Sequence, residues 1–149
     1  MIKFIGEHAA KLDDKGRLVF PSAFKMLIDS ADSKQFVVKR SLFTQCLEMY
    51  TLEQWEEESR SILSRLNINL KRSDNEFWRK YMKDSAIIEP DERVGRIMIP
   101  KKLLDMIGVE KHVVFCGNDF KIEIWAKDKY EADGMSDEDF ITLAEKLLG

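Results

Sequence analysis

The amino-acid sequence predicts an α+β protein built from two tandem, pseudo-repeated halves. The stretch KLDDKGRLVFP at residues 11–21 returns in similar form as PDERVGRIMIP at residues 90–100. After each copy, apolar residues first recur at helical spacing and then form short runs suited to strands. Similarity that returns in the same order along a chain indicates that one module has been duplicated.

The similarity of the two halves continues beyond the repeated turn. FVV at residues 36–38 corresponds to VVF at 113–115, and LEMYTLEQW at 47–55 corresponds to IEIWAKDKY at 122–130. Each half therefore predicts the same order of a turn, a short strand, a helix begun at proline, two strands and a helix.

Each repeated turn leads into a predicted strand that ends at a proline. Residues 17–20 and 96–99 are mostly apolar runs after a glycine-containing turn. Pro21 and Pro100 lack the N–H that a strand ladder needs, but a proline suits the first turn of a helix. Apolar residues at helical spacing follow both prolines, which predicts a short helix after each.

Two longer helices are predicted in the first half from their N-terminal capping residues. Thr51 with Gln54 forms a capping box ahead of apolar residues at helical spacing. Ser73 with Glu76 forms a second capping box, which predicts a further helix near residues 73–83. This second helix has no counterpart in the other half.

The predicted boundary divides the chain into an N-terminal half, residues 1–83, and a C-terminal half, residues 84–149. The first half carries the helical insertion, and the second ends in a helix of its own. Ser136 caps this last helix, and the amphipathic pattern of residues 136–149 predicts that it packs against the rest of the protein.

The composition limits the function classes. The 149 residues, 44% of them hydrophobic, suffice for one core or for two small halves that share an interface. No apolar run reaches the roughly 18 residues of a membrane-spanning helix, and the start lacks the apolar stretch of a signal peptide. Cys46 and Cys116 form no CxxC motif. We expect a cytoplasmic protein without a membrane partner or a metal.

The charge is unevenly distributed. A net charge of −3 argues against a nucleic-acid partner, because Lys and Arg dominate phosphate binding. However, residues 1–28 carry five basic and three acidic side chains, whereas residues 128–149 carry two basic and seven acidic ones. A basic face can therefore coexist with an acidic total.

The first turn places an arginine where it could bind nucleic acid. Arg17 enters a strand four residues after Asp13, whose carboxylate can hold the guanidinium in one orientation. With Lys11 and Lys15 nearby, an oriented arginine is better suited to bind DNA, at the edge of a guanine, than to bind a small metabolite. The same turn is also an ordinary strand connection whose arginine forms only a local ion pair. Because the turn occurs twice, DNA binding and an ordinary strand connection are equally well supported interpretations.

These residues resemble the MraZ family of bacterial transcription factors. EHAAKLDDKGRLVFP at residues 7–21, GRIMIP at 95–100 and the tandem arrangement carry the resemblance, which covers essentially the whole chain. It implies two tandem swapped-hairpin (double-split) β-barrel halves, related to AbrB, with peripheral helices. It also implies a homo-oligomeric ring, associated with the nucleoid, that regulates transcription. The ring would bind direct repeats in double-stranded DNA upstream of the division and cell-wall gene cluster, including its own gene.

In that family the element D-x-x-x-R contacts DNA. The resemblance thus implicates Asp13 and Arg17, with Lys15 between them. In the second copy, four positions before Arg96 is Glu92, and the aspartate lies one position earlier. We therefore expect Arg96 to be less well oriented than Arg17. The candidate DNA-binding residues are Lys11, Asp13, Lys15, Arg17, Glu92 and Arg96.

Enzymatic chemistry has little support in the sequence. His8 follows Glu7 and could serve a nucleophile such as Ser22, but the spacing supplies no orienting partner for a base. Neither GxGxxG nor GxxxxGK[ST] is present. We expect that the protein is not an enzyme and that it binds neither a cofactor nor a small-molecule substrate.

Two alternatives to a DNA-binding regulator remain open. A swapped-hairpin protein with an acidic tail could mainly be an interaction module, like related antitoxins whose tail wraps a toxin, with DNA binding secondary. The predicted packed helix at residues 136–149 favours the regulator. A purely structural ring is the third possibility, and it predicts no sequence preference for DNA.

Overall fold

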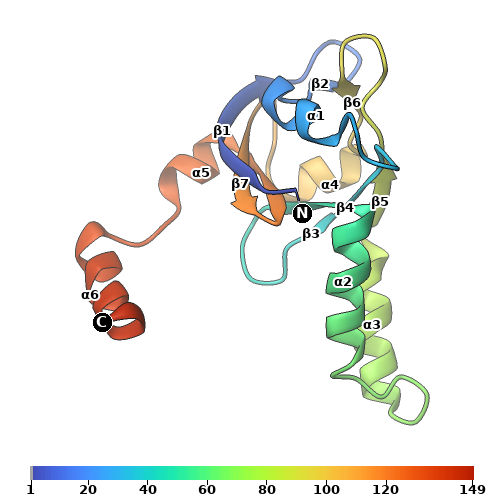
Figure 1. The fold of residues 1–149 in the computed structure, drawn as a ribbon, viewed down its shortest axis with the longest axis vertical. Coiled ribbons are helices and arrows are strands. Elements are labelled where there is room, and N and C mark those ends of the chain that lie inside the picture. The colour runs from blue at the N-terminus through green and yellow to red at the C-terminus, as the bar shows by residue number, and fades with distance from the viewer. Residues whose placement is uncertain (1) are drawn as a thin grey trace.

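The two halves of the chain share one β-sheet in the computed structural model, which describes residues 2–149 (Figure 1). The sheet is antiparallel, has the order β1-β7-β8-β4-β3-β5, and is accompanied by a two-stranded ribbon, β2-β6. The strands are β1 (Phe4–Lys11), β2 (Leu18–Val19), β3 (Phe36–Arg40), β4 (Leu47–Thr51), β5 (Ser85–Ile88), β6 (Arg96–Ile97), β7 (His112–Asp119) and β8 (Lys121–Ala126). The helices are α1 (Ser22–Ile28), α2 (Leu52–Leu63), α3 (Arg72–Lys83), α4 (Lys101–Met106), α5 (Lys127–Ala132) and α6 (Asp137–Leu148).

Each strand of one half pairs with a strand of the other half, in the same pattern in both directions. The first strand of each half pairs with the third strand of the other, so that β1 pairs with β7 and β5 pairs with β3. The second strands pair with each other as β2-β6, and the fourth strands as β4-β8. Because neither half completes its own sheet, each depends on the other for its backbone hydrogen bonds.

The short elements around the repeated turns agree with the sequence-based prediction. Strands β2 and β6 lie within the predicted runs, although only two residues of each form ladder pairs. Helices α1 and α4 begin directly after Pro21 and Pro100, as the prolines predict.

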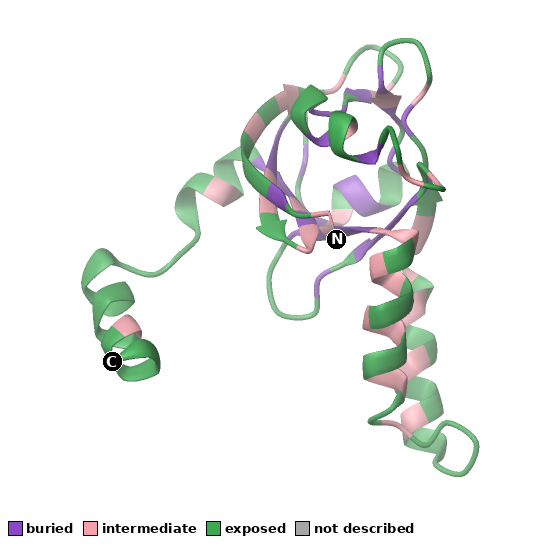
Figure 2. Ribbon diagram, viewed as in Figure 1, coloured by how far each residue is buried: buried purple, intermediate pink, exposed green. Residues whose placement is uncertain are grey.

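The core lies between the sheet, the ribbon and the short helices α1 and α4 (Figure 2). Phe24 and Ile28 of α1 are 1% exposed, and Leu103 and Leu104 of α4 are 3% and 4% exposed. Both halves therefore contribute to one apolar cluster, and the ribbon packs on it.

The helices α2 and α3 form an antiparallel hairpin that projects from the body (Figure 1). Thr51 caps α2 as predicted, because its hydroxyl accepts a hydrogen bond from the Gln54 N–H at 3.1 Å. The predicted cap of α3 is wrong: the helix begins at Arg72, and Ser73 already lies inside it. Aromatic contacts hold the hairpin to the sheet, among them Trp55 of α2 against Tyr50 of β4.

The last helix, α6, forms where it was predicted but does not pack. Ser136 caps it, because its hydroxyl accepts from the Asp139 N–H at 3.1 Å. However, α6 has no buried residue and stands away from the body after an extended linker (Figure 1). The expectation of a packed terminal helix is therefore wrong for the single chain.

Two strands were not predicted at all. The strands β1 and β5 each open a half and lie at the two edges of the sheet. Within residues 2–149, no helix has the length and apolar character needed to cross a membrane.

Candidate nucleic-acid interface

The first repeated turn is organised around the carboxylate of Asp13. Its Oδ1 accepts hydrogen bonds from the backbone N–H of Lys15 at 2.9 Å and of Arg17 at 2.8 Å. Its Oδ2 accepts from the Nε of Arg17 at 2.9 Å. Gly16 has a φ of 77°, in the left-handed region that favours glycine. The turn thus fixes both the backbone and the guanidinium of Arg17.

The second turn is organised in the same way around Asp91. Its Oδ1 accepts from the N–H of Val94 at 2.8 Å and of Gly95 at 3.0 Å. Its Oδ2 accepts from the Nε of Arg96 at 2.9 Å. Gly95 has a φ of 78°, close to that of its counterpart in the first turn.

The expectation that Arg96 is less well oriented than Arg17 is therefore wrong. Asp91 rather than Glu92 holds Arg96, because the second turn is one residue longer and the extra residue is accommodated in the loop. The side chains of Arg17 and Arg96 are 26% and 27% exposed, respectively. The structure gives the two guanidinium groups the same aspartate contact and nearly the same exposure.

The hydrogen bonds also affect the ionisation of the aspartates. The backbone N–H of Arg17 contributes most to holding the pKa of Asp13 below its ordinary value of 3.8. The backbone N–H of Val94 contributes most to lowering the pKa of Asp91, and the side chain of Arg96 adds to the effect. Both carboxylates are therefore charged, and both can orient an arginine, throughout the physiological pH range.

One face of the β2-β6 ribbon anchors it to the core. Alternate residues of a strand point to opposite faces. Leu18 and Phe20 of one strand segment are each 1% exposed, and Ile97 and Ile99 of the other are 1% and 2% exposed. The inner face of the ribbon is consequently fully packed against the core.

The outer face of the ribbon carries both arginines. Val19 lies directly opposite Arg96, and the same register places Arg17 across from Met98. Figure 1 shows the two turns side by side at the end of the molecule away from the helical hairpin. Each aspartate hydrogen bond uses the Nε of its arginine, which leaves the terminal guanidinium nitrogens available as donors to a ligand.

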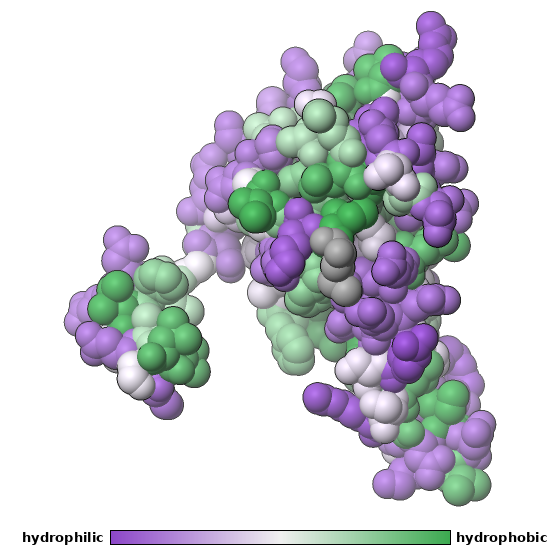
Figure 3. All heavy atoms as spheres, viewed as in Figure 1, coloured by the Kyte–Doolittle hydropathy of each residue, from purple (hydrophilic) through white to green (hydrophobic). Residues whose placement is uncertain are grey.

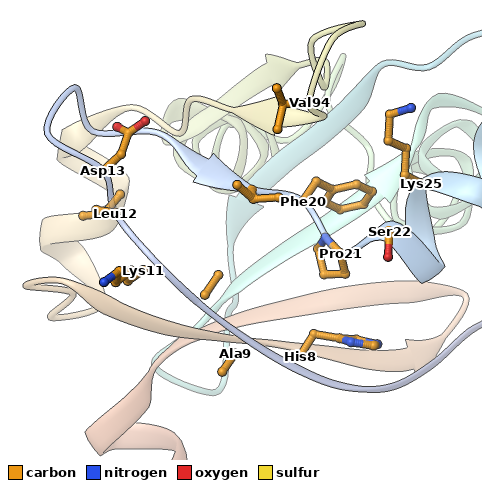
Figure 4. A pocket seen from close by; sticks show the side chains of 12 residues that line it. His8, Ala9, Lys11, Leu12, Asp13, Phe20, Pro21, Ser22, Lys25 and Val94 are labelled. Atoms are coloured by element: carbon orange, nitrogen blue, oxygen red, sulfur yellow. The ribbon is translucent and has the colours of Figure 1, made fainter.

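A hollow of about 550 Å³ lies beside the first turn, lined by β1, the ribbon and α1 (Figure 4). Lys11 and Lys25 line it together with His8 and Asp13. A Cβ added at Gly95 would lie 2.8 Å from the Cδ of Lys25, so this lysine passes over the second turn. Two lysines, Lys11 and Lys25, thus lie beside the ribbon.

The remaining predicted residues lie at the edges of the site. Lys11 ends β1 and is exposed, and Lys15 and Glu92 are exposed in the first and second turns. The sequence-based prediction did not include Val19 and Met98, although strict alternation with buried residues would have placed them beside the arginines. Residues 2–149 contain no group of three or more His, Cys, Asp and Glu side chains that could hold a metal ion.

Comparison with known proteins identifies the family of the chain. A family model described as "MraZ protein, putative antitoxin-like" matches residues 3–76 and 88–148. A protein of Christiangramia forsetii named "Transcriptional regulator MraZ" is 39% identical over 152 residues, which cover 100% of this chain and 95% of the relative. Proteins with the same name from Bacteroides thetaiotaomicron and Pediococcus pentosaceus are 33% and 38% identical. The first match covers 99% of this chain and 94% of the relative, and the second covers 97% and 96%.

The fold and the site together define a duplicated α+β protein with an antiparallel sheet, whose two carboxylate-held arginines lie on one β-ribbon. Both the family model and these relatives span nearly the full chain. The chain belongs to the MraZ family.

Proposed function

We propose that this protein is a sequence-specific regulator of transcription that binds double-stranded DNA through the outer face of the β2-β6 ribbon. The observation that carries the proposal is the pair of arginines, Arg17 and Arg96, held by aspartates in the same geometry on one face. The names of the relatives support a role in transcription.

The geometry suits the major groove of DNA. This groove admits a two-stranded β-ribbon, and a bidentate arginine contact to guanine O6 and N7 is the commonest specific contact there. A guanidinium that is already oriented loses less conformational entropy when it binds. Arg17 and Arg96 would contact guanines, and Asp13 and Asp91 would orient them.

The other candidate residues take supporting roles in this proposal. Lys11 and Lys15 are exposed beside the first arginine, where they would neutralise phosphates. Glu92 is exposed in the second turn, where its carboxylate could accept a hydrogen bond from a cytosine amino group. The acidic residues 128–149 lie mainly in α5 and α6, outside the ribbon.

We further propose that copies of the chain close into a homo-oligomeric ring that binds direct repeats. The target would lie upstream of the division and cell-wall gene cluster, including the gene of this protein, and the ring would act on the nucleoid in the cytoplasm. The exposed apolar side chains of α6 support association, because a helix with this surface gains stability when another chain covers it.

An antitoxin-like interaction module is the second candidate. The exposed, acidic α6 favours it, because a helix that is free in the single chain can bind a different protein. In that case loss of α6 would abolish binding of a protein partner and leave DNA binding unchanged.

The test is binding of the purified protein to DNA from upstream of its own gene, compared with random DNA, over a salt titration. We expect a clear preference for the upstream DNA and a linear decrease of log K with log salt. Lys15→Ala should weaken binding to both DNAs and reduce the slope by about one unit for each phosphate that the lysine neutralises. Equal binding to both DNAs would indicate a structural ring or an interaction module.

A further inference from the structure

We propose that Val19 and Met98 contact the methyl groups of thymines next to the bases that Arg17 and Arg96 bind. The inference rests on the proposed DNA binding and adds a second determinant of base specificity. It follows from the side chains that alternate with, and lie opposite to, the two arginines on the outer face of the ribbon.

Both residues are exposed at a place where the fold does not need them. Val19 is 53% exposed and Met98 is 57% exposed, although their neighbours Leu18 and Ile97 are each 1% exposed and supply the packing of the ribbon. Single exposed apolar side chains are common on protein surfaces. Here, however, Val19 lies directly across the ribbon from Arg96, and the same register, continued by one residue, places Met98 across from Arg17.

The chemistry of the major groove supplies a partner for this pattern. Guanine presents two acceptors there, whereas thymine presents the only methyl group, which apolar side chains contact. A ribbon that only neutralised phosphates would gain nothing from apolar residues between its arginines. Phosphate oxygens are negatively charged hydrogen-bond acceptors, and they bind basic or hydrogen-bond-donating groups. The alternation of arginine and apolar residue therefore fits base edges.

The spacing also suits neighbouring base pairs. Residues two apart on a strand are separated by about 6.6 Å, which is close to two base-pair steps of about 3.4 Å. Directly opposed residues on paired strands lie about 5 Å apart. The four outward side chains of Arg17, Val19, Arg96 and Met98 can consequently meet one short segment of DNA.

The experiment removes the methyl groups from the DNA and can be done before the exact target sequence is determined. The upstream DNA is amplified once with dTTP and once with dUTP, and the dissociation constants of the protein for the two products are compared. Uracil differs from thymine at this edge by the methyl group alone. We expect about fourfold weaker binding to the uracil DNA for each methyl contacted in a bound repeat, as for one buried methyl group.

Two variants and a control assign the effect to the ribbon. Val19→Ala and Met98→Ala should each weaken binding to thymine DNA about as much as the removal of one thymine methyl group, with a smaller effect on uracil DNA. Leu70→Ala is the matched control, because Leu70 is 84% exposed at the tip of the helical hairpin. It should bind both DNAs like the unaltered protein.

The outcomes separate this inference from the proposed function. Equal affinity for thymine and uracil DNA, with the preference over random DNA retained, would overturn the methyl contacts alone. Equal losses for Val19→Ala on both DNAs would assign Val19 a different role and also overturn the inference for that residue. Failure to bind either DNA would overturn both proposals.

Discussion

At the residue scale, the two turns differ in length but hold their arginines through the same contact. Asp13 precedes Arg17 by four residues and Asp91 precedes Arg96 by five, yet both Nε···Oδ2 distances are 2.9 Å. Counting four positions back from the arginine points to Glu92, because residue spacing alone does not report the geometry of a turn. The constant features are an aspartate at the start of the turn and a glycine with positive φ before the arginine.

The aspartates give a prediction about ionisation. Hydrogen bonds lower the pKa of Asp13 and Asp91 in the folded protein, so both should titrate below 3.8 in an NMR titration of the side-chain carboxyls. Each contribution to stability is present above pH 3.8 and is lost as the pH falls through the lowered pKa. In Arg17→Ala, the pKa of Asp13 should rise while that of Asp91 stays unchanged. Unshifted values in the unaltered protein would contradict the described turns.

At the element scale, the sequence predicted those elements that carry a local signal. The proline-started helices α1 and α4 and the cap of α2 at Thr51 follow from short-range chemistry, and the structure contains them. The predicted cap at Ser73 is wrong because a serine followed by a glutamate three residues later also occurs inside a helix. Here Glu76 instead accepts from Arg72 at 3.0 Å.

The edge strand β1 could not be found from such local signals. In β1 the residues after Phe4 include glycine, histidine and two alanines, which have little intrinsic preference for strands. This strand forms because its backbone pairs with β7 of the other half along eight residues. Local pattern therefore misses a strand whose stability comes from a partner more than 100 residues away.

The buried lysine of β3 gives a prediction at this scale. Lys39 is 1% exposed, and its Nζ lies 3.4 Å from the centre of the Tyr81 ring. Burial lowers the pKa of Lys39 to about 8 from 10.5. Because the unfolded chain then binds more protons, the free energy of unfolding should rise as the pH increases above about 8.

Urea unfolding at fixed protein concentration between about pH 7 and 9.5 tests this dependence. The upper limit avoids the titration of tyrosines, since burial raises the pKa of Tyr81 to about 12 and stability is then lost above the ordinary value of 10. Burial also raises the pKa of Cys46 to about 11 and raises that of Cys116, so both thiols lower the free energy of unfolding as the pH approaches and passes 9. Lys39→Met, which keeps the volume of the side chain, should lack the rise that Lys39 contributes, so the difference in stability between the two proteins should change with pH above about 8. A rise of the same size in the variant would show that another group is responsible.

At the scale of the whole molecule, the halves form one unit whereas the last helix lies apart from it. The amphipathic pattern correctly placed α6, but the pattern cannot tell which surface covers its apolar side. Figure 3 shows apolar side chains gathered on this detached segment. Phe140 is 58% exposed and Leu147 is 69% exposed, so a single chain leaves them in water.

The proposed association of chains predicts that α6 determines the oligomeric state. Light scattering should show an assembly for the unaltered protein at micromolar concentration, and a smaller species for the double variant Phe140→Glu, Leu147→Glu. The charges would lie on the apolar side of α6, where burying them without partners is costly. Leu70→Glu, on the exposed hairpin tip, should assemble normally. A monomeric unaltered protein would contradict the proposed ring.

Deleting residues 136–149 should leave the fold of the chain intact, because α6 contributes no buried residue to the body. The thermal unfolding temperature of the deletion variant should be compared with that of the unaltered protein at the same subunit concentration. We expect it to fall only by the amount that the loss of association between chains explains. A collapse of secondary structure outside α6, visible by circular dichroism, would show that the helix packs against its own chain.

The central claim is that the two turns form one DNA-binding surface. The measurement is the dissociation constant of Arg17→Ala and of Arg96→Ala for the same upstream DNA, with the oligomeric state of each variant checked by light scattering. A bidentate contact contributes about 1 to 3 kcal/mol, and an assembly that binds several repeats multiplies each loss. We predict large losses of similar size for both variants, with little rescue by Arg17→Lys or Arg96→Lys because lysine lacks the bidentate fork. A correctly assembled Arg17→Ala or Arg96→Ala protein that binds the upstream DNA normally would contradict the account.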